Sequence, residues 1–293
     1  MPKPLRGTYT VLVTPFTADA EAVDLKALER LVAFQIDEGV EGLIPLGSTG
    51  EFLSVSREER TAIIETCLRA AAGRVPVLIG TGAEDTREAV SLAREADAMG
   101  AQGVLVIPPF YSVPTADELY VHYKRIADAI GIPVMVYNNP ATANVDLTPD
   151  ILARLSTIEG CCYVKESTLE VTRVRDIIQA CEGRMEVFAG VLGYESAWLG
   201  AVGWVAVCSN VAPRLSADVF RLAASGDLAA ALPLYRRLAP LLPWVGGPRY
   251  VSGTKAALKL IGRDMGGPRA PRLPLPEGDL GALRLVLAGM GLV

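Results

Sequence analysis

Short apolar runs alternate with longer helical patterns along most of the chain. The runs are β-prone and carry few polar positions, which is typical of strands covered on both faces of a parallel sheet. Eight runs are predicted as strands, at 9–14, 42–46, 75–79, 103–107, 133–137, 161–165, 185–189 and 204–207. Most recur at intervals of roughly 25–33 residues, the length of a strand with its crossover helix. The pattern predicts an α/β fold of the (β/α)8 TIM barrel type.

Helix-start signals follow several of the runs. Asp24 is a good N-cap residue, and Ser56 with Glu59 has the spacing of a capping box. Thr148 precedes a proline, which is favoured at the first position of a helix. The runner-up fold is a doubly wound open sheet, but that fold usually carries a glycine-rich fingerprint after its first strand. Here the first run leads into Thr-Pro-Phe at 14–16 instead.

The pattern changes after about residue 213. Strand signals become rare there, and helices are predicted over 216–224, 228–242, 254–261 and 280–288. Glycine- and proline-rich breaks separate the later helices. We therefore expect a catalytic barrel over residues 1–212 and a C-terminal helical extension over residues 213–293.

Composition narrows the class of partner. Hydrophobic residues make up 51% of the 293 residues and charged residues 21%, so the chain is globular. The net charge is −5 without a basic block, which argues against nucleic acid and membrane as partners. Neither a signal peptide nor an apolar run long enough to span a membrane is evident. The five cysteines show no CxxC spacing, which favours a reducing cytoplasmic location.

The histidine content restricts the chemistry. His122 is the single histidine and falls inside a helical pattern, so we interpret it as structural. A histidine-rich metal site is excluded, and a Ser-His-Asp triad would depend on this one residue. We expect no metal and no cofactor, and chemistry carried by Lys, Tyr, Ser, Thr or carboxylate side chains.

Lys165 ends the sixth run. Side chains at the carboxyl ends of barrel strands converge on one face, where barrel enzymes carry out their reactions. Apolar surroundings disfavour the charged form of a lysine, and a neutral amine attacks a carbonyl carbon to give a Schiff base. The alternative is an ordinary surface lysine beyond a strand. Every other lysine of the chain falls in a helical or terminal segment.

Other strand exits supply polar groups. Ser48 and Thr49 lie between Gly47 and Gly50, so that backbone N–H groups there can approach a carboxylate closely. An ordinary turn or a phosphate cradle is the alternative for this loop. The fifth run ends at Tyr137, whose phenol can carry protons, although a tyrosine at a strand end is usually a packing residue.

Tyr111 follows the fourth run. It is a candidate second member of a hydroxyl relay, and the alternative is an exposed aromatic side chain in a loop. Val205, in the eighth run, completes the expected substrate-binding set with Gly47, Ser48 and Thr49.

Together, these motifs resemble the dihydrodipicolinate synthase/N-acetylneuraminate lyase family. The three signatures that carry the resemblance are Gly-Ser-Thr-Gly-Glu at 47–51, Tyr-Asn-Asn-Pro at 137–140 and Val-Lys-Glu-Ser at 164–167. Matching segments also occur at 11–16, 80–82 and 207–211. The signatures stand in the family's order and spacing over nearly the whole chain.

The resemblance implies a barrel enzyme that forms a Schiff base with pyruvate or another 2-oxo acid and needs no metal. It implies that Lys165 forms the imine and that Tyr137 is the acid and base. Ser48 and Thr49 would hold the carboxylate of the 2-oxo acid, with Thr49 also in the proton relay. Tyr111 matches a residue that reaches into a neighbouring subunit's site in the synthases, so the resemblance also implies a homo-oligomer, a dimer or tetramer.

The sequence departs from the family's pattern at two places, and both affect which substrate is expected. Thr142 occupies the place of an arginine that binds the carboxylate of the synthases' aldehyde substrate, and threonine cannot replace a bidentate guanidinium. Gly-Val-Leu-Gly at 190–193 replaces the acidic pair with which sialic acid lyases bind a polyol tail. We therefore expect an aldolase, dehydratase or deaminase acting on a small 2-oxo acid, such as a 2-keto-3-deoxy sugar acid or a hydroxyproline-derived pyrroline carboxylate.

Three alternatives remain at this stage. One is 4-hydroxy-tetrahydrodipicolinate synthase activity. Another is a non-catalytic module that binds a 2-oxo acid without turnover. The last is a phosphate-binding barrel enzyme that uses the loop at 47–50.

Overall fold

Parallel strands and helices alternate along residues 4–293, the part of the chain that the computed structural model describes. The strands are β1 (Gly7–Val11), β2 (Gly42–Ile44), β3 (Leu78–Gly80), β4 (Gly103–Val106), β5 (Val134–Asn138), β6 (Tyr163–Glu166), β7 (Glu186–Ala189) and β8 (Gly203–Ala206). With the helices between them they make up a (β/α)8 TIM barrel, and C-terminal helices follow. The predicted fold class is confirmed.

The helices of the barrel part are α1 (Leu25–Asp37), α2 (Arg57–Ala71), α3 (Thr86–Ala98), α4 (Ala116–Ala127), α5 (Pro149–Leu155), α6 (Thr172–Cys181) and α7 (Gly193–Trp198). Those that follow β8 are α8 (Pro213–Ala224), α9 (Leu228–Leu238), α10 (Leu242–Gly246), α11 (Tyr250–Leu260) and α12 (Glu277–Gly289). Short 3-10 turns are η1 (Ser48–Gly50), η2 (Phe52–Ser54), η3 (Cys208–Asn210) and η4 (Ala239–Leu241). None of the helices within 4–293 is both long and apolar enough to cross a membrane.

Contacts divide the chain into two compact units. The first contains residues 4–6 and Pro76–Val205, and the second contains Gly7–Val75 and Ala206–Val293. The division into residues 1–212 and 213–293 follows the order of elements along the chain and stays a prediction.

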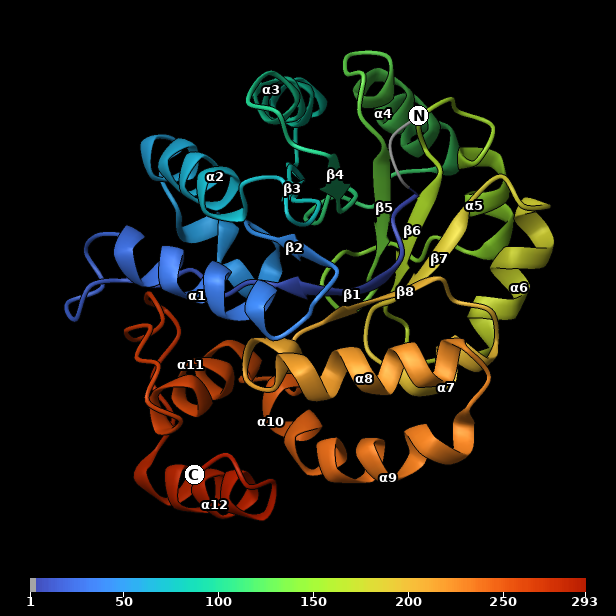
Figure 1. Ribbon diagram of the computed structural model, residues 1–293. Coiled ribbons are helices and arrows are strands. Elements are labelled where there is room, and N and C mark those ends of the chain that lie inside the picture. Colours follow the sequence, from blue (N-terminus) through green and yellow to red (C-terminus); the bar gives the residue numbers. More distant parts are fainter. Residues whose placement is uncertain (1–3) are drawn as a thin grey trace. The chain divides into compact units, whose positions relative to one another are not determined.

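The first unit is built on strands β3 to β8. They pair in parallel in sequence order, and the register aligns Tyr137 of β5 with Lys165 of β6 and Phe188 of β7. The alternate residues Val136 and Val164 are completely buried. Figure 1 shows α5 and α6 on the outer side of the green-to-yellow strands β5 to β7. Residues of these strands therefore alternate between a site-facing side and a helix-facing side.

The second unit contains the β1–β2 pair and the C-terminal helices α8 to α12. Helix α8 packs on β1, and α1 packs on α2 (Figure 1). Helix α2 starts with the predicted capping box: the Ser56 hydroxyl accepts from the Glu59 backbone N–H, and the Glu59 carboxylate accepts from the Ser56 N–H. Asp24 caps α1 in the same unit.

The boundaries of some strands differ from the prediction because backbone N–H groups there donate to side chains instead of to a neighbouring strand. Strand β1 ends at Val11 instead of residue 14, because the Val13 N–H donates to the Asn210 side chain. Strand β3 begins only at Leu78, because Pro76 lacks an N–H group and Val77 donates to the Gln102 side chain. The predicted helix over 228–242 is divided into α9, η4 and α10, with prolines at the first turns of the latter two.

Candidate active site

A lysine and a tyrosine on adjacent strands form the centre of the candidate site. Lys165 of β6 and Tyr137 of β5 stand side by side in the parallel register, so both side chains point to the same face. Lys165 is 5% exposed and Tyr137 is 6% exposed. The Lys165 Nζ atom lies 3.9 Å from the centre of the Tyr137 ring. The structure brings together the two residues to which the sequence assigned imine formation and proton transfer.

The surroundings of the Tyr137 phenol favour its ionised form. Burial by itself raises the pKa of Tyr137, but the positive charge of Lys165 opposes this effect. The Asn139 amide, which donates to the phenol oxygen, adds to that opposition, as do the nearby polar groups of Lys165 and Ser167, and the pKa of Tyr137 lies below its ordinary value. A phenol that loses and regains its proton more readily is a better proton carrier near neutral pH.

Gly190 makes room for Ser167 on the site-facing side. A Cβ atom on Gly190 would lie 1.7 Å from the Ser167 Oγ atom and 2.7 Å from the Glu166 carbonyl oxygen. No side chain fits there without moving the backbone of β6. The glycine therefore keeps the Ser167 hydroxyl beside Tyr137 and Lys165, a role that the sequence analysis missed.

The helix-facing side of the same strands carries a saturated polar network. The Asn138 side chain donates to Glu166 at 2.9 Å and to Asp146 at 3.1 Å, and it accepts from the Leu147 N–H at 2.9 Å. Burial raises the pKa of Asp146, but hydrogen bonds from Arg173 and Asn138 outweigh it and lower that pKa. These contacts fix the ends of β5 and β6, from which the site-facing residues project.

Tyr111 lies apart from the buried pair. Its side chain is 85% exposed, in the loop after β4. The loop backbone is held from both sides: the Glu84 carboxylate accepts from the Tyr111 N–H at 2.9 Å, and the Asn144 amide donates to the Tyr111 carbonyl at 3.0 Å. The phenol is presented outward on a fixed backbone.

Val205 lies on β8 and is completely buried. The register of β7 and β8 aligns Phe188 with Gly203, so Val205, two residues further, shares the face of Lys165. An apolar side chain at that place can shape a pocket but cannot hold a charge.

The loop after β2 belongs to the second unit. Gly47 precedes η1, in which Thr49 is buried and Ser48 is partly exposed. The Thr14 hydroxyl donates to the Gly50 carbonyl at 2.7 Å. Glu51, directly after η1, adopts a left-handed backbone conformation with φ of 53°. Such a conformation is unfavourable for a side chain with a Cβ and persists only where the surroundings hold it.

A buried ion pair holds Glu51. Its carboxylate lies 2.8 Å from the Lys255 Nζ atom of α11, and both side chains are buried. The Arg269 backbone N–H donates to the same carboxylate at 3.0 Å. Burial lowers the pKa of Lys255, and Glu51 partly offsets this by favouring the ammonium. No local motif predicts this pair, because its members are about two hundred residues apart along the chain.

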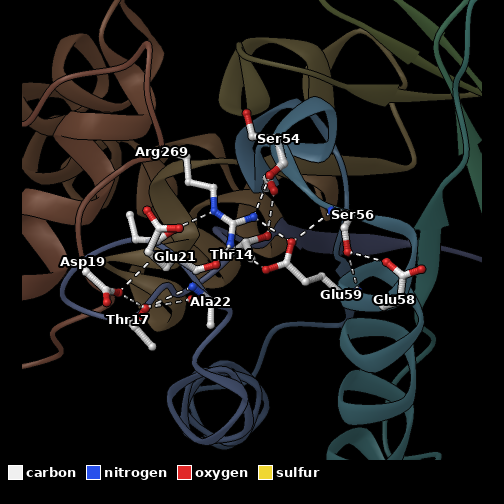
Figure 2. Close-up of polar contacts among 12 residues, drawn as sticks. Thr14, Thr17, Asp19, Glu21, Ala22, Ser54, Ser56, Glu58, Glu59 and Arg269 are labelled. Atoms are coloured by element: carbon white, nitrogen blue, oxygen red, sulfur yellow. Dashed lines mark hydrogen bonds and ion pairs between the residues drawn. The ribbon is translucent and has the colours of Figure 1, made fainter.

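The Arg269 side chain holds the segment that follows Glu51 in the sequence (Figure 2). Its guanidinium contacts both carboxylate oxygens of Glu59, at 2.5 and 2.7 Å, and the Ser54 carbonyl at 2.6 Å. It also contacts the carbonyls of Ala20 and Glu21. The bidentate contact lowers the pKa of Glu59. Arg269 and Lys255 thus fix η2 and the end of the Gly47–Gly50 loop in one conformation.

Two further groups bear on the expected chemistry. His122 is buried in α4, and burial lowers its pKa to about 4, so it is neutral and accepts or donates one bond with the Thr86 hydroxyl. Among residues 4–293 no group of three or more His, Cys, Asp or Glu side chains is arranged to hold a metal ion.

Comparisons with known proteins agree on one family. A model of the dihydrodipicolinate synthetase family matches residues 4–288. The chain is 40% identical over 295 residues to the 4-hydroxy-tetrahydrodipicolinate synthase of Nitrobacter hamburgensis, which covers 97% of each chain. It is 39% identical over 292 residues to the synthase of Rhodopseudomonas palustris, with 98% of this chain and 97% of the relative covered.

Solved structures give the same result. The dihydrodipicolinate synthase of Acinetobacter baumannii, crystallised with pyruvate, superposes with a TM-score of 0.95 at 35% identity and covers 99% of this chain and 100% of its own. A structure described as the first monomeric dihydrodipicolinate synthase variant superposes with a TM-score of 0.94 at 32% identity, covering 98% of this chain and 97% of its own.

Proposed function

Because the chain belongs to the dihydrodipicolinate synthetase family and is a class I Schiff-base lyase, we propose that Lys165 forms its imine with pyruvate or a related 2-oxo acid. The amine nitrogen attacks the keto carbon to give a carbinolamine, and loss of water then gives the imine. Tyr137 takes up and returns the protons of these steps. The observation that carries the proposal is the buried Lys165–Tyr137 pair, with Nζ 3.9 Å from the ring centre.

The remaining candidate residues are assigned supporting roles. The backbone and hydroxyls of Ser48 and Thr49, after Gly47, bind the carboxylate of the 2-oxo acid, and Thr49 takes part in the proton relay. Val205 shapes the pocket wall. The fixed conformation of the loop, set by Glu51, supports this assignment, since an anion is bound best by donors that do not have to be reordered.

Tyr111 is assigned to a second copy of the chain. Its exposed phenol on a backbone fixed by Glu84 and Asn144 supports a homo-oligomer in which the phenol reaches the neighbouring site. One similar structure is a monomeric variant, so the assembly has to be measured, by sedimentation or light scattering. A monomer that keeps full activity after Tyr111→Phe would contradict this assignment.

The first candidate reaction is that of 4-hydroxy-tetrahydrodipicolinate synthase. The relatives above carry this name at 39–40% identity, and they support it over the 2-oxo acid dehydratase or deaminase activity that the sequence favours. In this reaction the imine condenses with an aldehyde that bears a carboxylate.

A second candidate is retained because of Thr142. Its hydroxyl donates to the Asn139 carbonyl at 3.3 Å and offers no positive charge to a carboxylate. Aldol cleavage, dehydration or deamination of a small 2-oxo acid does not require the arginine that the synthases have there. A non-catalytic binding module is disfavoured by the complete Lys165–Tyr137 pair.

Trapping with borohydride tests the proposal. Reduction in the presence of pyruvate should add one pyruvate-derived group to the intact wild-type protein and none to a Lys165→Ala variant. Unmodified wild type would contradict the proposed function. Turnover then separates the reactions: consumption of pyruvate with the synthases' aldehyde indicates the first candidate, and release of water, ammonia or pyruvate from a panel of 2-oxo acids indicates the second.

We infer a reducing cytoplasmic environment from the cysteines. All five are free thiols, and none forms a disulfide. Burial raises the pKa of Cys67 and of Cys208 to about 12, so these thiols are unreactive. The pattern fits a compartment in which disulfides do not form.

A further inference from the structure

Two consecutive asparagines, Asn138 as the last residue of β5 and Asn139 directly after it, have side chains that face opposite sides. Asn138 is completely buried on the helix-facing side, where every polar atom of its side chain has a partner. Asn139 lies directly beyond the strand, and its side chain is on the site-facing side, where it contacts the Tyr137 phenol. Pro140 follows and disfavours a helical conformation at Asn139.

The turn after Asn139 is made by its backbone. Its carbonyl oxygen accepts from the backbone N–H groups of Thr142 at 3.0 Å and Ala143 at 2.9 Å, and from the Thr142 hydroxyl at 3.3 Å. Asparagine commonly stabilises turns through its side chain, but that is not how it acts here. The side-chain amide Nδ2 instead donates to the Tyr137 phenol oxygen at 2.9 Å.

We propose that Asn139 is a positioning residue that acts on the reaction through Tyr137, by donating its amide N–H to the phenol oxygen and stabilising negative charge there. The inference rests on the proposed function of Tyr137 as the proton carrier. A tyrosine that gives its proton to the carbinolamine becomes a phenolate, and a neutral donor held at its oxygen stabilises that state without adding a charge.

The groups that act on the phenol come from two neighbouring segments of the first unit. Lys165 of β6 supplies the charge, and Ser167, directly after β6, supplies a hydroxyl. Tyr123 of α4 approaches only the backbone of Tyr137, and Phe188 of β7, beyond Lys165 in the register, is apolar. Asn139 is therefore the neutral amide in this set, and its loss has a predictable direction: the phenolate becomes less stable.

A matched pair of variants tests the proposal. Asn139→Leu keeps the size of the side chain and removes the donor, whereas Asn139→Gln keeps an amide donor at this half-buried position. The rate of borohydride-trapped adduct formation with pyruvate is measured against pH. We expect the rising limb of the profile for Asn139→Leu to move to higher pH by about one unit, with roughly tenfold slower trapping below the limb. Asn139→Gln should recover part of this loss.

A double-mutant cycle with Tyr137→Phe tests whether Asn139 acts on the reaction through the Tyr137 phenol. In a Tyr137→Phe background, Asn139→Leu should cause no further loss, because the group through which Asn139 acts is absent. An equal further loss, an unshifted profile or a shift to lower pH would overturn the proposal, the last because it would mean that the amide accepts from the phenol.

A titration without substrate separates this inference from the proposed function. The ultraviolet phenolate signal of Tyr137 is obtained by subtracting the Tyr137→Phe protein, with and without Asn139→Leu. The phenol should ionise at a pH higher by about one unit without the amide. If wild type forms no adduct but the Tyr137 phenol still ionises at higher pH after Asn139→Leu, the proposed function is contradicted and the contact is supported. If wild type forms the adduct but the phenol ionises at the same pH with and without Asn139→Leu, the contact alone is contradicted.

Discussion

Two buried lysines, one in each unit of the protein, differ in what surrounds the amine. Lys165 is 5% exposed and Lys255 is 2% exposed. Each amine also lies over an aromatic ring, with Lys165 Nζ 3.9 Å from the centre of Tyr137 and Lys255 Nζ 4.1 Å from the centre of Phe16. Burial and ring contact therefore do not distinguish the two.

The groups that contact the two amines distinguish Lys165 from Lys255. Lys255 lies 2.8 Å from the Glu51 carboxylate and donates to the Gly267 carbonyl at 2.9 Å, which favours a permanent ammonium with a structural role. Lys165 has no carboxylate within ion-pair distance in the part of the chain that the structure describes, and its neighbour is a phenol with a lowered pKa. A buried amine is available for chemistry where its partner can take its proton, and it serves stability where its partner is a fixed anion.

The largest expected effect follows from removing the Lys165 amine. Lys165→Met should lower turnover by at least about 10⁴-fold, because the covalent step has no other nucleophile. The free energy of unfolding should stay the same or rise, because an apolar chain of similar length replaces an amine without an anionic partner. Steady-state kinetics and urea unfolding measure the two. Retained turnover would remove Lys165 from the role of nucleophile.

The second lysine should give the opposite result. Lys255→Met leaves the buried Glu51 carboxylate without its close cation, since the partly exposed Arg272 guanidinium is 3.9 Å away, and we expect the free energy of unfolding to fall by about 3–5 kcal/mol. Trapping with pyruvate should still occur on the molecules that remain folded. Urea unfolding measures the loss.

Lys259 provides the control, because it lies on the same helix, is 70% exposed and pairs with Asp264 at the surface. Lys259→Met should change the free energy of unfolding by no more than about 0.5 kcal/mol. A similar loss in both variants would mean that the buried pair does not hold the loop. Loss of trapping by the folded Lys255→Met protein would contradict the division of roles.

The smallest effect concerns Glu59, which anchors the same unit. The hydrogen bonds from Arg269 hold the pKa of Glu59 below its ordinary value of 4.5. A carboxylate with a lowered pKa stabilises the folded protein above its ordinary value, and this contribution is lost as the pH falls through the lowered pKa. The melting temperature of wild type should therefore fall more steeply in acid than that of Glu59→Gln. Parallel curves for the two proteins would show that the Arg269 contact contributes nothing to acid stability.

The features that the sequence predicted are local or periodic. Repeating apolar runs indicated the strands, and a lysine at the end of one of them indicated a candidate nucleophile. Tyr137 was a candidate because it ends the fifth apolar run, and the structure pairs it in register with Lys165. A predicted strand boundary was wrong where a backbone N–H group donates to a side chain far along the chain, as the Val13 N–H does to Asn210.

The features that escaped depend on contacts between distant segments or on the direction of a side chain. Nothing near Glu51 in the sequence points to Lys255 or Arg269. Asn139 is not part of β5, and only its hydrogen bond to the phenol shows that its side chain turns toward Tyr137. The need for glycine at 190 follows only from the position of the Ser167 hydroxyl.

Peptide mapping of the borohydride-reduced protein shows which of the two buried lysines reacts. After reduction with pyruvate, digestion and mass spectrometry, we expect the adduct on the peptide that contains Lys165 and an unmodified Lys255. An adduct on Lys255, or on both buried lysines alike, would contradict the claim that the partner of the amine, and not its burial, decides which lysine reacts.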